Sequence, residues 1–452
     1  MPVKEGACLQ ADSHMAAPSP DHRPVWKHVQ NVGDECADED TIDADTITAV
    51  AFSPSGAYLA AGDKSGRVWI HAEKSSKEFD HVHQYEYYTH FQSHKHDIDY
   101  LKSQDIEEKI NMIRWCPNTH GSQMLLTTND KTIKLWKLYQ HFVHSITNLN
   151  RDGRDGVLRI PVLSHVDTVP ACTLKNAFTD AHAYHINSIS LNSDHETFIS
   201  SDDLRINMWH LSVPNVSFNI IDIKPENMEE LTEVVTSAQF HPVSCNQLIF
   251  SSSRGVIRLM DMRCKALLTS PDVVFESEAD LQDRSFFSEI VSSISDATFT
   301  RDGRFIVSRD YLTSKIWDVR VPVRPLHVVA THDYIKPRLS DVYENDCIFD
   351  KFEVAVAGNR FITGSYNSEA IIYDWDAHLT HRIRPPKPTR SRVHQFTTRG
   401  FHENAVRKRS AVPAVHPHEF DFQRKCLHVA WHPTDDVVAV ACQNELAVHQ
   451  LL

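Results

Sequence analysis

The stretch FTDAHAYHINSISLNSDHETFISSDDLRINMWHL, residues 178–211, decides the fold of this chain. A strand pattern runs over 186–191, with apolar and polar residues alternating from 188 to 191, a polar turn follows at 192–196, and two further apolar runs lead to Trp209. Such alternation, rich in β-branched and aromatic residues and bounded by polar turns, predicts three short antiparallel strands. This unit does not require four of its polar residues, which are therefore candidates for function: Tyr184, His185, Asp202 and Asp203.

The same layout recurs seven times along the chain. The segments are AFSPSGAYLAAGDKSGRVWI (51–70) and its counterparts at 113–138, 189–211, 238–262, 297–319, 352–375 and 429–451. A large side chain stands at each aligned third-strand position: Trp69, Trp136, Trp209, Met260, Trp317, Tyr373 and His449. Such a side chain can fill the wedge between neighbouring units, which one unit could not bury alone. The repeats therefore predict an all-β fold, a seven-bladed WD40 β-propeller whose closed ring presents no open sheet edge.

The spacing of the repeats indicates additional segments around the seven units. It exceeds the roughly 40–45 residues of a plain WD repeat, so we expect fourth strands and long loops. A strand near Val25–Val29 is predicted to supply the outer strand of the last blade. The insertion after blade two is hairpin-like, with its tip at the Arg-Asp-Gly repeat of 151–156, and a basic loop precedes blade seven. The predicted organisation is a disordered extension at 1–21 and a propeller at 22–452, with insertions at 137–163 and 378–420.

Composition restricts the classes of function. The chain has 452 residues, 60 of them acidic and 46 basic, for a net charge of −14. This charge argues against nucleic acid as the main ligand, because a basic surface is needed to neutralise phosphates. It favours partners rich in Lys and Arg, although an acid excess also serves solubility alone. No apolar run reaches the about 18 residues of a membrane span, so no membrane partner is expected.

Targeting signals and cysteines indicate the compartment. No secretory leader is evident at the N-terminus, and the nine Cys include no C-x-x-C pair. This pattern predicts reduced thiols in an intracellular protein. We expect a cytoplasmic location, and the basic run Arg407–Arg409 leaves nuclear import open.

The sequence predicts neither a metal nor a cofactor. The histidine pairs His81–His83 and His94–His96 lack Cys or carboxylate partners at metal-binding spacing. No glycine-rich, phosphate-cradling motif occurs either.

No catalytic residue is predicted. A hydrolase triad of Ser200, a histidine (His182 or His185) and Asp203 is conceivable, but it lacks a nucleophile elbow. His182 and Asp203 also have a structural interpretation, because their offsets match the His and turn Asp that hydrogen-bond inside WD blades. Asp203 precedes Trp209 by six residues, and Asp63 and Asp130 occupy the same offset before their own Trp.

Long stretches carry a resemblance to a known family. They include FQSHKHDIDYLKSQDIEEKINMIRW (91–115), NDKTIKLWK (129–137), SFNIIDIKPENMEELTEVVTSAQFHP (217–242), SFFSEIVSSISDATF (285–299), SRDYLTSKIWD (308–318), YENDCIFDKFE (343–353) and LHVAWHP (427–433). AHAYHINSIS together with SDDLRINMWHL is specific to this family among WD proteins. The chain resembles the WD-repeat B-type regulatory subunits, the 55-kDa class, of protein phosphatase 2A.

The resemblance implies a non-catalytic regulator. Such a propeller docks on a helical-repeat scaffold (A) subunit, next to a catalytic (C) Ser/Thr phosphatase subunit, and selects phosphoprotein substrates. The resemblance also implies a groove that binds substrates and inhibitors through basic or helical segments. Carried over by matching motif, the groove residues are Tyr184, His185, Asp203, Met228, Leu231, Val234, Phe286, Phe287, Asp346, Phe349 and Lys351.

Spacing and charge fit these residues to a groove. Met228, Leu231 and Val234 stand three apart, a helical spacing that would present one apolar stripe. Asp203 could pair with an Arg or Lys of a bound segment. An acidic rim could extend it through Glu107, Glu108 and Asp202.

Alternatives stay open for several of these assignments. Leu231 could be a buried loop anchor, and Phe286 with Phe287 could be a blade-core pair. The insertion after blade two, which reaches the scaffold in the family, looks shortened here. A general WD40 interaction scaffold without phosphatase assembly is therefore the alternative function.

Overall fold

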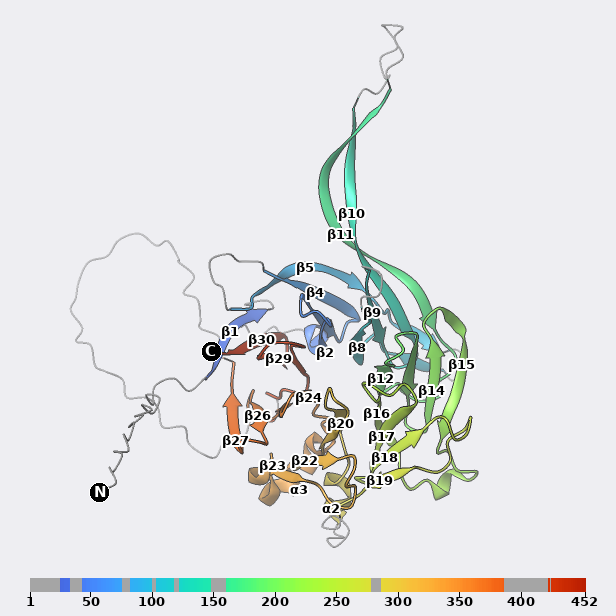
Figure 1. Cartoon of the computed structure of the whole chain (residues 1–452), viewed down its shortest axis with the longest axis vertical. Helices are drawn as coiled ribbons and strands as arrows, with labels where there is room; N and C mark the ends of the chain where they lie inside the picture. Colours follow the sequence, from blue (N-terminus) through green and yellow to red (C-terminus); the bar gives the residue numbers. More distant parts are fainter. Residues whose placement is uncertain are drawn as a thin grey trace, which may run out of the picture.

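A computed structural model describes residues 25–32, 43–74, 82–99, 103–117, 122–147, 160–277, 286–385, 422 and 424–452. Seven four-stranded antiparallel sheets stand around a central axis like the blades of a propeller (Figure 1). Strands within the first six blades follow sequence order, and the seventh recruits a strand from the N-terminal part of the chain. The predicted seven-bladed β-propeller is therefore confirmed.

Each blade consists of three strands foreseen from the repeats and a fourth outer strand. Blade one comprises β2 (Ile47–Phe52), β3 (Tyr58–Asp63), β4 (Arg67–Glu73) and β5 (Tyr85–Gln92). Blade two comprises β8 (Met112–Trp115), β9 (Gln123–Thr128), β10 (Ile133–Thr147) and β11 (Val162–Phe178). Blade three comprises β12 (Ser188–Leu191), β13 (Thr197–Ser201), β14 (Arg205–His210) and β15 (Val213–Asp222). Blade four comprises β16 (Val235–Phe240), β17 (Gln247–Ser252), β18 (Ile257–Asp261) and β19 (Val273–Phe275). Blade five comprises β20 (Asp296–Phe299), β21 (Phe305–Arg309), β22 (Thr313–Asp318) and β23 (His327–Ala330). Blade six comprises β24 (Val354–Ala357), β25 (Arg360–Gly364), β26 (Ala370–Asp374) and β27 (Leu379–Ile383). Blade seven comprises β28 (Val429–Trp431), β29 (Val437–Cys442), β30 (Glu445–Leu451) and β1 (Trp26–Val32).

Short elements fill the connections between blades. They are the hairpin of β6 (Asp97–Asp99) and β7 (Gln104–Ile106), the 3-10 helices η1 (Asp43–Asp45), η2 (Met228–Glu230), η3 (Asp333–Arg338) and η4 (Cys347–Phe349), and the α-helices α2 (Phe286–Val291) and α3 (Leu339–Glu344). Within the described residues, no helix has the length and apolar character needed to cross a bilayer.

The ring closes through strand β1. It pairs antiparallel with β30, beginning with Trp26 opposite Leu451, and Trp26 packs edge-on against Trp431 with ring centroids 5.6 Å apart. Val32 at its other end joins a buried cluster that spans blades seven and one. The prediction that a strand near residues 25–29 completes the last blade is confirmed.

One large residue was assigned to the wrong place in its blade. Cross-strand pairing defines an equivalent row in every blade: Leu191, Phe198 and Trp209 in blade three, and Phe52, Leu59 and His71 in blade one. The residue equivalent to Trp209 is therefore His71, not Trp69. Side chains two apart on a strand share a face, so the alternating pattern cannot distinguish these two positions. Burial lowers the pKa of His71 to about 4, which keeps this wedge residue neutral.

The insertion after blade two is a long hairpin that leaves the propeller. Strands β10 and β11 stay paired from Ile133 opposite Phe178 to Thr147 opposite Val162, and their outer part projects away from the ring (Figure 1). Residues 137–147 and 162–163, assigned to an insertion, thus belong to two strands of blade two. The predicted tip at 151–156 lies outside the described residues.

Two expectations about the last part of the chain need correction. Strand β27 is the fourth strand of blade six, so the basic insertion assigned to 378–420 begins after it. Residues 386–420 of that insertion and the extension at 1–21 lie outside the described residues. The prediction of reduced thiols is wrong for Cys426 and Cys442, which are joined in a disulfide with Cα atoms 4.8 Å apart.

Candidate functional site

One face of the ring carries a cleft between blades three and six. It is built by the loops that enter the inner strands and by turns between the second and third strands. Its volume is about 770 Å³. Four of the predicted groove residues line it: Asp203, Val234, Phe349 and Lys351. The seven-fold ring thus brings together residues that lie up to about 150 positions apart in the chain, as closed repeat architectures do.

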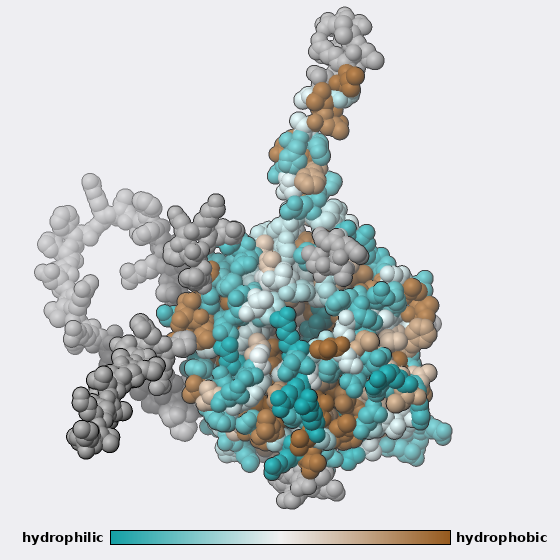
Figure 2. Space-filling view, in the orientation of Figure 1, coloured by the Kyte–Doolittle hydropathy of each residue, from teal (hydrophilic) through white to brown (hydrophobic). Residues whose placement is uncertain are grey.

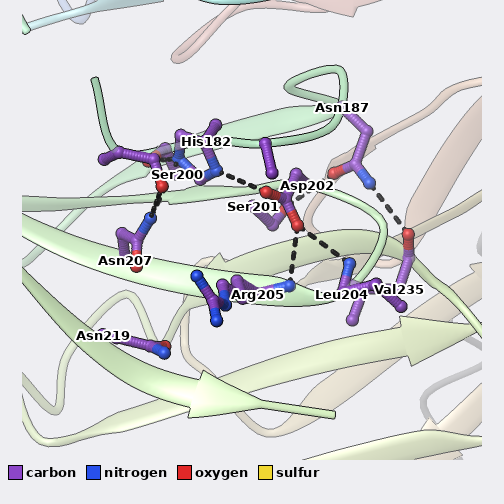
Figure 3. Close-up of polar contacts among 12 residues, drawn as sticks. His182, Asn187, Ser200, Ser201, Asp202, Leu204, Arg205, Asn207, Asn219 and Val235 are labelled. Atoms are coloured by element: carbon purple, nitrogen blue, oxygen red, sulfur yellow. Dashed lines mark hydrogen bonds and ion pairs between the residues drawn. The ribbon is translucent and has the colours of Figure 1, made fainter. Parts of the chain in front are cut away.

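The two neighbouring aspartates of blade three have different roles. Asp202 is fully buried, and its carboxylate accepts hydrogen bonds from His182 Nδ1 at 2.9 Å and from the amides of Leu204 and Arg205 at 2.8 and 2.7 Å (Figure 3). Burial works to raise the pKa of Asp202, but these hydrogen bonds outweigh it and hold the pKa below its usual value. Asp202 therefore does not belong to the acidic rim.

The structural role assigned to Asp203 falls to Asp202. The prediction relied on an offset of six residues from the Trp, taken from Asp63 before Trp69 and from Asp130 before Trp136. The residue equivalent to Trp209 in blade one is His71, and in blade two the amides of Lys131 and Thr132 donate to Asn129, seven residues before the Trp, so the offset of six is not transferable. Asp310 of blade five, seven residues before Trp317, accepts from the amides of Leu312 and Thr313 as Asp202 does from its own turn.

The geometry of a catalytic triad is present but sealed. Trp209 Nε1 donates to Ser200 Oγ at 2.8 Å, and Ser200 Oγ lies 2.6 Å from His182 Nε2. The His182 side chain is 1% exposed and Asp202 is fully buried, so no substrate can reach the serine. The arrangement is a buried hydrogen-bond network that stabilises the blade, and the hydrolase interpretation is wrong.

Asp203 faces the cleft beside a cation. Burial raises the pKa of its carboxyl, with Lys351 and His185 acting in the opposite direction. Burial in turn lowers the pKa of Lys351, which Asp203 counteracts. The two opposite charges, from blade three and from the loop entering blade six, therefore stand close enough to act on each other at the cleft.

Exposed aromatic side chains gather at one end of the cleft. Phe286 and Phe287 lie 5.4 Å apart, and Tyr343 lies within 6.2 Å of both and of Phe349, measured between ring centroids. Phe286 and Phe349 are 63% and 59% exposed. Both rings open helix α2, and the interpretation as a blade-core pair is wrong for the exposed Phe286, whereas Phe287 is half-buried and packs against a buried cluster that includes Tyr311. Sequence reasoning missed Tyr343, because it lies on a separate element, α3, with no periodic relation to the other rings.

The predicted helical stripe at 228–234 is only partly helical. Helix η2 covers Met228–Glu230, capped by the Asn227 side chain, and Leu231 is already extended. In the segment after the helix, Glu233 forms a two-pronged ion pair with Arg258 at 2.7 and 3.0 Å. The Ser253 amide also donates to the Val234 carbonyl. Met228 remains exposed, Leu231 is half-buried, and Val234 reaches the cleft wall.

The remaining predicted residues lie around the same face. His185 Nδ1 is 3.7 Å from Asp130 of blade two, and Tyr184 beside it is 38% exposed. The carbonyl of Glu107 accepts from the Asn129 side chain at 3.0 Å, which places Glu107 and the half-buried Glu108 at the blade-two end. Asp346 is exposed and starts η4 with a left-handed φ of 57°.

One group of potential metal ligands has a structural explanation. His83, His432 and Asp435 bring their ligand atoms within 4.8 Å of one another. However, Nδ1 of His432 accepts from the Asp435 amide at 3.0 Å, as Nδ1 of His241 accepts from the Ser244 amide at 2.9 Å in blade four. The same turn geometry recurs in two blades, so we interpret it as a feature of the repeat and assign no metal to it.

Known proteins resemble this chain along most of its length. The model of the WD domain, G-beta repeat, matches residues 40–70 and 173–210. The chain is 46% identical to the B regulatory subunit of protein phosphatase PP2A from Schizosaccharomyces pombe, over 94% of this chain and 98% of that protein. It is 42% identical to the "Serine/threonine-protein phosphatase 2A regulatory subunit phr2AB" of Dictyostelium discoideum, again over 94% of this chain and 98% of the relative.

Proposed function

Since the chain belongs to the family of regulatory B subunits of protein phosphatase 2A, we propose that it selects phosphoprotein substrates for that enzyme through the cleft of its propeller. The protein is a non-catalytic regulator associated with the phosphatase complex. In our proposal it docks on the scaffold (A) subunit next to the catalytic (C) subunit, and it acts in the cytoplasm.

The observation that carries the substrate-selecting role is the pairing of charge and aromatic surface in the cleft. Asp203 offers a half-buried carboxylate in the same cleft as the exposed Phe349, whose ring lies 6.2 Å from Tyr343, which in turn lies 5.7 Å from Phe286. A carboxylate in such a recess favours an Arg or Lys, which would compete with Lys351 for it. Exposed aromatic rings favour the apolar side of an amphipathic segment. A basic helical segment of a substrate or inhibitor matches both.

The projecting hairpin supports docking on a second protein. Its outer part exposes a series of apolar side chains, a feature that soluble monomers rarely show and that marks interaction surfaces. They are visible as brown atoms along the arm in Figure 2. These side chains are Phe142, Ile146, Ile160, Val162, Leu163 and Val166, each at least half exposed. We propose that this surface contacts the scaffold subunit.

Loss of this apolar surface is expected to separate the regulator from the complex. Ile146 and Leu163 lie opposite each other and are 51% and 65% exposed. A double change, Ile146→Asp with Leu163→Asp, should lower recovery of the scaffold and catalytic subunits from native lysate by about tenfold, since burying two unpaired charges opposes association. Val323→Asp, at a residue 70% exposed on blade five, is the matched control and should leave recovery unchanged.

The same pull-down discriminates the alternative function. A wild-type chain that binds basic peptides but recovers neither the scaffold nor the catalytic subunit would be a general WD40 interaction scaffold, and the docking proposal would be wrong.

The aromatic end of the cleft gives a second test. Phe286→Ala should weaken binding of a basic amphipathic peptide by about 1–3 kcal/mol, the loss typical of an aromatic interface anchor. The melting temperature should stay nearly constant, because the side chain is 63% exposed. Phe218→Ala, at a similarly exposed ring (59%) on β15, is the control. Equal affinities for both variants in fluorescence anisotropy would remove Phe286 from the site.

A further inference from the structure

The chain segment that enters blade seven runs beside the wall of the cleft. The amide of Ser368 donates to the carbonyl of Arg424 at 3.0 Å, and the Cys426 amide donates to the Ser365 carbonyl at 3.0 Å. Lys425 forms an isolated bridge with Tyr366. At Gly364 a side chain would collide with the Cys426 carbonyl, 1.8 Å away. The segment therefore lies directly on the edge of blade six.

Lys425 links this segment to the cleft wall. Its ammonium pairs with the carboxylate of Asp350, which is 11% exposed. The Tyr366 hydroxyl lies 2.9 Å from the other oxygen of Asp350. Asp350 stands between Phe349 and Lys351, both of which line the cleft. The ion pair of Lys425 with Asp350 therefore helps to position Phe349 and Lys351 at the cleft.

The next residue, Cys426, is fixed to blade seven by its disulfide with Cys442. Cys442 is the last residue of β29, so the disulfide joins the loop entering the blade to the end of its second strand. Both cysteines are buried, with exposures of 0% and 7%. Exchange of this disulfide consequently needs local opening of the segment, which outside the sheets is among the less stable parts of a fold.

We propose that Cys426 and Cys442 form a thiol–disulfide switch that sets the affinity of the cleft through Lys425 and Asp350, an inference that rests on the proposed substrate-selecting function. In the oxidising step, a low-molecular-weight disulfide such as oxidised glutathione gives up its S–S bond. The Cys426–Cys442 bond forms, and the two protein thiol protons leave on the two small thiols released. Reduction reverses each of these changes.

The physical link is the placement of the segment. Two free thiols cannot remain at bonding distance, so reduction separates Cys426 from Cys442 and releases a constraint on Lys425. A less fixed Lys425 leaves Asp350, and with it Phe349 and Lys351, free to adopt more positions. A ligand must then order these residues when it binds, which weakens binding.

The experiment measures peptide affinity in both thiol states of the assembled holoenzyme. The probe is a synthetic helix of about 20 residues with Arg on one face and Leu on the other, long enough to be marginally helical alone, and its binding is followed by fluorescence anisotropy. We expect the chain treated with oxidised glutathione to bind about fivefold more tightly than the chain treated with dithiothreitol, the lower end of typical couplings between linked sites. Mass spectrometry after alkylation verifies the state of each cysteine.

Three variants locate the effect. Cys442→Ser should bind like the reduced wild type under both conditions. Cys264→Ser, at an exposed cysteine of blade four, should keep the fivefold response. Lys425→Met should retain the disulfide but respond less than about twofold, because the link to Asp350 is cut; a purely structural disulfide would not lose its effect in this way.

The outcomes separate this inference from the proposed function. Equal affinity in the two thiol states overturns the switch and leaves substrate selection standing. An unchanged response in Lys425→Met overturns the assigned link. A probe that binds in neither state, while the subunits still co-purify, overturns both the cleft as a docking site and its regulation.

Discussion

Replacing Asp203 by Lys is expected to abolish binding of basic segments while the propeller keeps its melting temperature. The substitution turns an attractive charge into a repulsive one beside Lys351, so the cleft would present two cations to an incoming Arg or Lys. Loss of a close charge pair in a partly buried site costs about 2–5 kcal/mol, at least about a 30-fold loss of affinity. Anisotropy with a basic peptide measures the affinity, and differential scanning fluorimetry checks the fold.

The matched control reverses a charge on the same blade. Glu196 lies in the turn between β12 and β13, and its side chain is 75% exposed. Glu196→Lys changes the net charge of the protein by the same amount as Asp203→Lys. If both variants lost affinity equally, the attraction would be a property of overall charge, and Asp203 would have no special role.

The adjacent carboxylate should give the opposite result. Asp202→Ala removes the acceptor of three hydrogen bonds in a fully buried site and leaves His182 without this partner. Removing one member of such a buried pair destabilises a protein by about 3–5 kcal/mol. We expect a large fall in melting temperature and in the urea midpoint, with partner binding lost only as the fold is lost. Retained stability with weakened binding would place Asp202 in the cleft after all.

The stability that Asp202 contributes should depend on pH in one direction. The pKa of Asp202 in the folded protein lies below its usual value. In the unfolded chain we expect the value of a model peptide, about 3.9. The contribution is therefore present above the unfolded pKa and is lost as pH falls through the folded pKa. Asp202→Asn, which keeps the shape but cannot ionise, should show a flatter decline of stability below about pH 4 than the wild type.

The fold was predictable because its signal is repeated. Seven copies of one strand pattern average out local ambiguity, and a missing fourth strand in the last copy pointed to the short segment around Val25–Val29. Two features limited this prediction. Alternation repeats every two residues, so it could not decide between Trp69 and His71. Turn length varies between blades, so it could not decide between Asp202 and Asp203.

The site was predictable only through residues carried over from the family. Those residues define four lining positions of the cleft and three of its aromatic rings, but not the contacts that hold them. Met228 to Val234 has helical spacing, yet the helix ends at Glu230, Leu231 is extended, and Glu233 is paired with Arg258 on β18. Tyr343 and the Cys426–Cys442 disulfide depend on proximity between elements that are distant in the chain, for which no local pattern exists.

Closure of the ring by β1 and β30 has a consequence for biosynthesis. The ribosome delivers Trp26–Val32 long before Glu445–Leu451, and at typical synthesis rates the interval is on the order of tens of seconds. During that time the early strand has no partner, and the nascent chain carries two unmatched sheet borders that could join another molecule. A chain arrested before residue 445 would lack the strand that pairs with β1, so it would remain an open ring whose unpaired strand edges favour association with other chains.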